Sequence, residues 1–351
     1  MKSGWRTIVL VATAVVAAAT AVVVVVFVVV PHIREGRADP ARLLAARADR
    51  FYGEERYDDA AAVYEQVVTD YPSSPLAVEA GEKKKLSEAK SLFAEARMLA
   101  RAGRYYEAGD LLSKATTLAP DDVEVNYGVG WIYFQLAVDN LASAQLSGGG
   151  RLTGDYLLLT KTYAELARQR FERCVALDAK HWAGYRGLAL YHIFSQEYDE
   201  GLKDLAVADK YSAKPEDKVA VGRMRVQAYI GKKDYAQAKA TLDALLEKYP
   251  DRGDVYYSLA EYYLRQEKPD VAEAKKALEV GVGKTFDDPG TKNQLYGMLS
   301  RLRRDAKDYD GAVSAAADGL AGDPFNDSLV KQYTLAYGSK LMSEPSPAPK
   351  P

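Results

Sequence analysis

The chain has 351 residues, a formal net charge of -2 and one cysteine, Cys174. The length allows two or three domains, and the nearly neutral charge provides no broad electrostatic attraction to nucleic acid. One cysteine excludes an internal disulfide framework and cannot by itself form a zinc site.

An apolar run without charged residues, Thr7 to Val30, follows a short flank at residues 1–6. As an α-helix it would be roughly 36 Å long, which exceeds the about 30 Å of a bilayer's hydrocarbon core. A cleaved signal peptide has a shorter apolar core and a small-residue cleavage site, whereas Pro31, His32 and Arg34 follow this run directly. The sequence therefore predicts an uncleaved transmembrane anchor at residues 7–30 and a linker at residues 31–40.

Charges on the two flanks of this anchor favour opposite orientations. Lys2 and Arg6 favour a cytoplasmic N-terminus, whereas arginines beyond the anchor, beginning at Arg34, favour the reverse. A very short N-terminal flank most often stays inside, and long domains are translocated largely regardless of charge. We expect the rest of the chain to be extracytoplasmic. The Ala-, Val- and Arg-rich composition suggests a bacterial inner membrane, and a cytoplasmic domain remains the alternative.

Beyond the linker, small and apolar residues recur at the spacing of packed helices. The first predicted hairpin spans residues 41–74, with apolar positions such as Ala48 and Phe51 in its first helix and Tyr64 in its second. After Pro75 a long helical run extends through Gly103, and its later part, with Leu92, Ala96 and Leu99, is the first helix of the second hairpin. We therefore expect extra helical residues between the first two hairpins.

The third predicted hairpin is interrupted. Its first helix contains Gly130 and Tyr133, but its second resumes only at Ala167. Residues 138–162 are therefore predicted to be an insertion, with Gly148 to Gly150 mobile and residues 157–163 able to prolong the following helix. Insertions in repeat proteins often lie on the binding face, although a tolerated surface loop is the simpler alternative.

The later hairpins are more regular, at residues 182–215 and 219–252 and in two further repeats ending near Pro324. Their pattern can be written as motifs. Tyr256-x2-Leu259-Ala260-x2-Tyr263 resembles the W-x2-L-G-x2-Y half of a tetratricopeptide repeat (TPR). Ala238-x3-Leu242, followed by Pro250, is similar to its second half, and related patterns recur at about 34 residues.

The resemblance to the TPR family covers about residues 41–342. It implies an all-α, right-handed solenoid of about seven helical hairpins. Residues 327–342 are predicted to form a capping helix over the last hairpin, because an open end would expose apolar surface. Residues 343–351 form a proline-rich tail that we expect to be disordered.

Features that could carry chemistry are sparse. Gly281-Val282-Gly283-Lys284-Thr285 resembles the end of a phosphate-binding loop, but Leu278 stands where the motif requires glycine. His181 and His192 lack the closely spaced companions of a metal site, and Cys174 suits a buried helix contact. We predict no catalytic site, no metal and no cofactor.

In the TPR family the first helices of successive hairpins line a concave groove. The exposed positions of that groove map onto a mixture of apolar residues and arginines, a composition typical of interaction hot spots. The candidate partner-binding residues are Tyr127, Trp131, Phe134, Arg186, Leu190, Ile193, Arg223, Ile230, Tyr257 and Leu264. The charged clamp that some TPR domains use for C-terminal carboxylates does not align with this sequence.

The resemblance and the apolar run together predict a noncatalytic, membrane-tethered TPR scaffold. Its groove would bind a peptide or protein partner during assembly of a membrane or envelope complex. Two alternatives are a self-assembling structural solenoid and a regulatory subunit of a membrane-associated enzyme.

Overall fold

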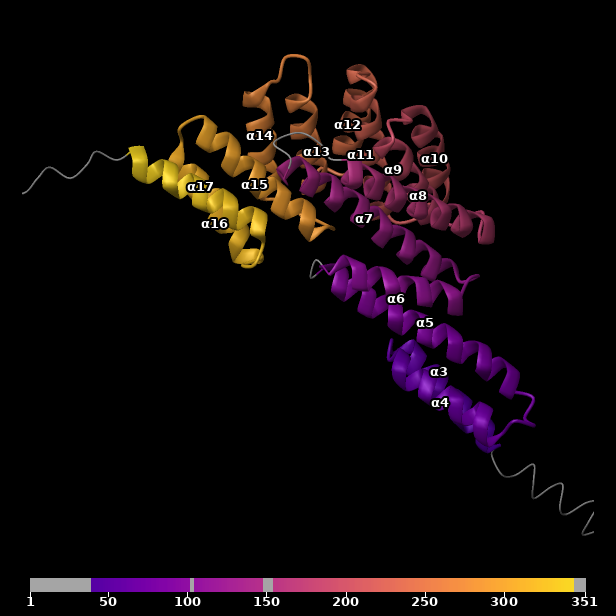
Figure 1. The fold of residues 1–351 in the computed structure, drawn as a ribbon. Coiled ribbons are helices and arrows are strands. Elements are labelled where there is room, and N and C mark those ends of the chain that lie inside the picture. The colour runs from indigo at the N-terminus through magenta and orange to yellow at the C-terminus, as the bar shows by residue number, and fades with distance from the viewer. Residues whose placement is uncertain (1–38, 102–103, 148–153, 344–351) are drawn as a thin grey trace, which may run out of the picture. The chain divides into compact units, whose positions relative to one another are not determined.

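The computed structural model describes residues 39–101, 104–147 and 154–343, and all regular elements in these ranges are α-helices (Figure 1). The helices are α3 (Pro40–Gly53), α4 (Tyr57–Asp70), α5 (Ala77–Arg101), α6 (Tyr105–Leu118), α7 (Val123–Ser147), α8 (Gly154–Leu177), α9 (Trp182–Phe194), α10 (Tyr198–Tyr211), α11 (Pro215–Gly231), α12 (Tyr235–Lys248), α13 (Gly253–Leu264), α14 (Val271–Val282), α15 (Pro289–Asp305), α16 (Tyr309–Gly322) and α17 (Asp327–Ser343). The prediction of an all-α chain of helical hairpins is confirmed.

Several predicted segments lie outside the described residues: the anchor at residues 7–30 with most of the linker, Gly148 to Gly150, and the tail from residue 344. Within the described ranges, no helix is both long enough and apolar enough to cross a membrane.

The chain divides into two compact units, residues 1–125 and 126–351. In the first unit α3 packs on α4, α4 on α5 and α5 on α6. The core beneath the first three helices includes Phe51, Tyr64 and Val67. One carboxylate also joins these helices, because Asp49 Oδ1 accepts hydrogen bonds from Tyr64 Oη (2.5 Å) and Lys83 Nζ (2.8 Å).

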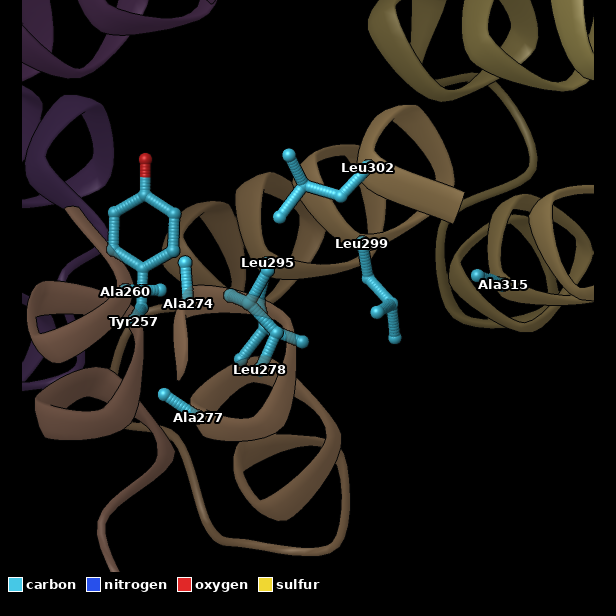
Figure 2. Close-up of a cluster of buried hydrophobic side chains, with 9 residues drawn as sticks. All are labelled: Tyr257, Ala260, Ala274, Ala277, Leu278, Leu295, Leu299, Leu302 and Ala315. Carbon is cyan, nitrogen blue, oxygen red and sulfur yellow. The ribbon is translucent and has the colours of Figure 1, made fainter. Parts of the chain in front are cut away.

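The second unit continues with the hairpins α7/α8, α9/α10, α11/α12, α13/α14 and α15/α16, and ends with α17. The first helices α9, α11, α13 and α15 contact one another in chain order, and each second helix also packs on the next first helix. Figure 2 shows one resulting core, in which leucines and alanines from α13, α14, α15 and α16 interlock around Leu278 and Leu295. Alternating small and large side chains let the helices approach closely.

Four hairpins share a turn that sequence reasoning did not find. The second residue after the first helix has a positive φ in each, between 58° and 64°, at Glu55, Gln196, Lys233 and Lys307. In the turn after α11, the Lys233 amide donates to Ile230 O and the Asp234 amide donates to Tyr229 O, both at 2.9 Å. These bonds satisfy the last carbonyls of the helix, and a tyrosine such as Tyr235 then begins the second helix. The shared turn gives these hairpins the same local connection.

The segment expected to be an insertion, residues 138–162, is mostly helical. Residues 138–147 continue α7, and residues 154–162 form the beginning of α8. The stretch lacks proline and is rich in leucine, a strong helix former, so both helices extend into it. The extra residues after Pro75 are likewise absorbed into the 25-residue helix α5.

Candidate partner-binding face

The ten predicted binding residues all lie on first helices of the second unit. Tyr127, Trp131 and Phe134 are on α7, Arg186, Leu190 and Ile193 on α9, Arg223 and Ile230 on α11, and Tyr257 and Leu264 on α13. We refer to this side of the four helices as the first-helix face. Seven of the ten side chains are partly exposed.

Three of the ten are buried, which corrects their expected exposure. Phe134 and Ile230 are each 6% exposed, and Tyr257 is 8% exposed. The Phe134 ring packs edge-on against Phe194, and Ile230 and Tyr257 belong to the apolar cores between repeats. Neighbouring hairpins cover these positions, so these side chains stabilise the array and are not available as surface contacts.

Arg186 lies at the centre of an aromatic cluster on α7 and α9. Its guanidinium carbon lies 5.6 Å from the ring centroid of Trp131 and 5.0 Å from that of Trp182. Arg186 Nη2 also donates a hydrogen bond of 2.5 Å to Tyr127 Oη. Cation–π contacts with both rings, together with this hydrogen bond, help to hold the planar guanidinium in place. We call Tyr127, Trp131, Trp182 and Arg186 the arginine–aromatic cluster.

Partly exposed apolar side chains continue from this cluster along α9. Leu190 and Ile193 pack against the buried core formed by Ala189, Leu205 and Met224. Ile193 also lies against Gly201 of α10, so the core and α10 limit the movement of these side chains. We call the exposed parts of Leu190 and Ile193 the apolar ledge. A pre-ordered apolar surface beside aromatic and arginine side chains reduces the entropy that a partner must lose on binding.

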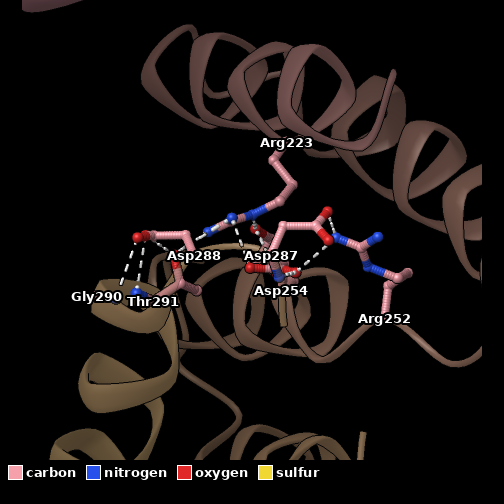
Figure 3. A network of polar contacts seen from close by, with 8 residues as sticks. Arg223, Arg252, Asp254, Asp287, Asp288, Gly290 and Thr291 are labelled. Carbon is pink, nitrogen blue, oxygen red and sulfur yellow. Dashed lines mark hydrogen bonds and ion pairs between the residues drawn. The ribbon is translucent and has the colours of Figure 1, made fainter. Parts of the chain in front are cut away.

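Arg223 has a different role from the one expected, as Figure 3 shows. From α11 it reaches α13 and α15: Nε donates to Ser258 Oγ (3.0 Å), Nη1 lies 3.4 Å from Asp254 Oδ1, and both Nη atoms are 3.4 Å from Thr291 Oγ1. Burial lowers the pKa of Arg223, and the Asp254 carboxylate offsets part of this effect. Arg223 therefore joins three consecutive first helices, which makes its main role structural.

Asp254 is the acidic centre of this network. Its Oδ2 accepts from Arg252 Nη2 (3.3 Å) and from the Asp287 amide (3.3 Å), and Arg252 also pairs with the Asp287 carboxylate. Asp288 caps the next helix, because its Oδ2 accepts from the Thr291 amide at 2.9 Å. The network fixes the loop between α14 and α15 against α13.

Glu261 on α13 is a buried acid near the same arginine. Burial raises the pKa of its carboxyl, and Arg265 and Arg223 offset this effect only in part. Its Oε2 is enclosed without a hydrogen-bond partner among the described residues. An incompletely paired buried carboxylate lowers stability when it is ionised.

We expect Glu261→Gln to raise the free energy of unfolding at neutral pH. The folded protein binds a proton at Glu261 more readily than the unfolded chain does, because the pKa is raised in the folded state. As the pH falls through that pKa, the free energy of unfolding of the wild type should therefore rise relative to that of the variant. The difference should shrink toward the ordinary carboxyl range of about 4. Urea unfolding at several pH values measures it, and the exposed Glu267→Gln serves as the control. A variant less stable than wild type at neutral pH would contradict this expectation.

The residues considered for chemistry have structural contacts. His181 Nδ1 accepts from the Gly184 amide (3.1 Å) and caps α9, His192 Nδ1 lies 2.7 Å from Asp204 Oδ2, and Cys174 is buried. Lys284 pairs with Asp251 at 2.9 Å. In the described part of the chain, no three His, Cys, Asp or Glu side chains are grouped so that they could hold a metal ion.

Trp182 is the member of the arginine–aromatic cluster that sequence reasoning missed. Its position four residues before Arg186 was a usable signal, because residues at i and i+4 share a helix face. Arg186 and Tyr127 are 59 residues apart in the sequence, so local spacing could not predict their contact.

Comparisons with known proteins agree with the hairpin fold. The tetratricopeptide repeat family model matches residues 45–123 and 223–280. A comparison with curated proteins gave no match. The fold is similar to that of a tetratricopeptide repeat protein from Parabacteroides merdae, with 13% identity, coverage of 85% of this chain and 98% of the other, and a TM-score of 0.54.

Two further solved structures are more distant. PilF from Pseudomonas aeruginosa is 14% identical, with coverage of 72% of this chain and 98% of that protein and a TM-score of 0.43. The C-terminal part of a TPR repeat-containing protein from Cytophaga hutchinsonii is 16% identical, with coverage of 82% and 98% and a TM-score of 0.42.

Proposed function

We propose that this chain is a noncatalytic TPR scaffold that binds a peptide or protein on its first-helix face. The observation that carries the proposal is the arginine–aromatic cluster beside the apolar ledge of Leu190 and Ile193. Tryptophan and arginine held in fixed positions are typical of residues that dominate binding energy. The match of two segments to the TPR model supports the same kind of function.

The proposal places the binding region on α7 and α9. Arg223, Ile230 and Tyr257, by contrast, maintain the spacing of α11, α13 and α15 from within the array. A partner would contact Trp131, Leu190 and Ile193 directly. Leu264 lies farther along the chain, packs partly against the core of α13 and α14, and would extend the contact surface.

Membrane tethering belongs to the same proposal and rests on the sequence of residues 7–30. An anchored scaffold keeps its binding face near the membrane, where it raises the effective concentration of its partners. We place the repeats outside the cytoplasm of a bacterial cell, attached to the inner membrane, because a short N-terminal flank usually remains inside.

Site-specific photo-crosslinking from positions 131 and 190 in native membranes tests the binding face. We expect discrete adducts from both positions and none from Lys203, whose side chain is exposed on α10. Replacing Leu190 with glutamate should remove the adduct formed from position 131. Adducts from Lys203 alone, or only between copies of the chain, would contradict the proposal.

The same membranes test the anchor and its orientation. The chain should resist extraction with alkaline carbonate, and protease added to spheroplasts should digest the repeats. Release by carbonate would exclude the anchor, and full protection from protease would exclude an extracytoplasmic location.

A further inference from the structure

The last helix, α17, carries an apolar surface that is separate from the first-helix face. It packs on α15 and α16 through the buried residues Leu329 and Ala336. On its other side, Val330 is 44%, Tyr337 45% and Leu341 52% exposed. The helix therefore covers the last hairpin, as expected, but its outer side is partly apolar, whereas terminal caps of repeat proteins normally present a polar outer face.

The position of α17 in the repeat explains this surface. It packs on α15 and α16 as α15 packs on α13 and α14, so it occupies the place of a first helix (Figure 1). Every preceding first helix of the second unit is followed by a second helix. In the described part of the chain, α17 has no such second helix.

The correspondence extends to individual residues. A shift of one repeat, about 34 residues, relates positions on α15 to positions on α17. The pairs are Tyr296 and Val330, Leu299 and Tyr333, Ser300 and Thr334, and Arg303 and Tyr337.

On α15 the residues at these positions pack against α16. Ser300 Oγ donates to Ala312 O (2.8 Å), Arg303 Nη1 donates to Gly311 O (3.1 Å), and Leu299 shares a core with Ala315. On α17, Val330, Thr334 and Tyr337 are exposed and Tyr333 is partly so. We call Val330, Tyr333, Thr334, Tyr337 and Leu341 the open seat.

The residues of the open seat are spaced as in a surface that packs against another helix. Val330, Thr334, Tyr337 and Leu341 are separated by four, three and four residues, the pattern of a seam between two packed helices. The Tyr333 and Tyr337 rings stack with centroids 6.1 Å apart and planes 4° apart. Gly338 has open space where a Cβ would lie, so a backbone can approach there closely.

Charge distinguishes between possible occupants. Lys331 and Lys340 flank the open seat, and Lys340 pairs with Asp310. The helix that fills the equivalent seat on α15 is α16, whose charged residues are acidic, at Asp310 and Asp318. If a second copy of α17 packed on the open seat, its Lys331 and Lys340 would approach those of the first copy and repel them. An acidic helix would instead be attracted.

We propose that the open seat binds an amphipathic α-helix of a partner protein, with an alanine- and leucine-containing seam and acidic flanks. The partner helix takes the place of the second helix of an eighth hairpin. This interaction does not depend on the proposed binding at the first-helix face.

The test uses the full chain and an 18-residue fluorescent peptide that has an alanine–leucine seam and glutamate flanks. A second peptide has lysine in place of each glutamate. We expect saturable binding of the acidic peptide in fluorescence anisotropy, and an affinity at least about tenfold lower for the lysine peptide. Tyr337→Glu should also weaken binding about tenfold or more. Val280→Glu, a matched control at a 44% exposed valine on α14, should not.

Reversal of the flanking charge gives an independent readout. Lys331→Glu should reduce binding of the acidic peptide and improve binding of the lysine peptide. Failure to saturate, or equal binding by the Tyr337 and Val280 variants, would overturn the proposal. So would a dimer in light scattering that Tyr337→Glu dissociates, because the occupant would then be a second copy of the chain.

Discussion

Replacing Asp254 with alanine is expected to lower the free energy of unfolding of the second unit by about 3–5 kcal/mol. Asp254 is 2% exposed and faces Arg223 and Arg252, whose side chains are only 17% and 16% exposed. Without Asp254, Arg223 retains hydrogen bonds to Ser258 and Thr291 but has no direct ion-pair partner among the described residues. The cost comes mainly from leaving a buried cation without its counter-charge.

Hydrogen exchange locates the loss as well as measuring it. In the full chain, amides of α11, α13 and α15 should exchange faster in the Asp254 variant, whereas those of α3 to α6 should not change. Urea unfolding gives the accompanying free-energy difference, analysed with allowance for intermediates because repeat arrays often unfold in steps.

A matched control is provided by Asp287, which pairs with the same Arg252 but is 44% exposed. Because Asp287 is partly exposed and Arg252 keeps its contact with Asp254, Asp287→Ala should cost less than Asp254→Ala. Equal losses in the Asp254 and Asp287 variants would show that burial does not determine the cost. In a double variant, Arg223→Met combined with Asp254→Ala should lose less stability than the sum of the single changes, because neither buried charge remains.

Local sequence patterns were sufficient to predict the helices and their pairing. Pro250 marks the end of a helix that stops at Lys248, as predicted. The start of α11 at Pro215, where a missing amide donor is tolerated, lies four residues before the predicted start of its hairpin at residue 219. Ala238 and Leu242 are fully buried, as their spacing predicted. Such features depend on contacts within one or two hairpins, which the repeat pattern records directly.

Contacts between successive hairpins could not be predicted in the same way. Arg223 was interpreted as a surface residue, but it meets partners that are 31, 35 and 68 residues away. Tyr257 and Ile230 occupy positions that an isolated hairpin would expose and that its neighbours cover. These assignments require the packing between repeats, which the hydrophobic period of one helix does not specify.

Phe171 on α8 is the second residue for which we expect a large effect. Its side chain is fully buried and its ring lies against Gly130 of α7 and Gly187 of α9. Phe171→Ala should cost about 3–5 kcal/mol, because it removes the ring and leaves a cavity where three helices meet. Urea unfolding of the full chain measures the loss, and hydrogen exchange should show it in α7, α8 and α9. A loss below about 1 kcal/mol would mean that the helices close over the cavity.

The two glycines leave the space that the Phe171 ring occupies between the helices. A Cβ at Gly187 would lie 2.4 Å from Phe171 Cδ1, and one at Gly130 would lie 2.8 Å from Cε1. Because the enclosed ring cannot move aside, Gly187→Ala should cost about 1–3 kcal/mol through overpacking. Phe171→Leu shortens the group that would clash, so the pair Phe171→Leu and Gly187→Ala should be less destabilising than the sum of the single variants. Strict additivity would mean that the two positions do not compete for the same space, and that other contacts set the approach of α8 to α9.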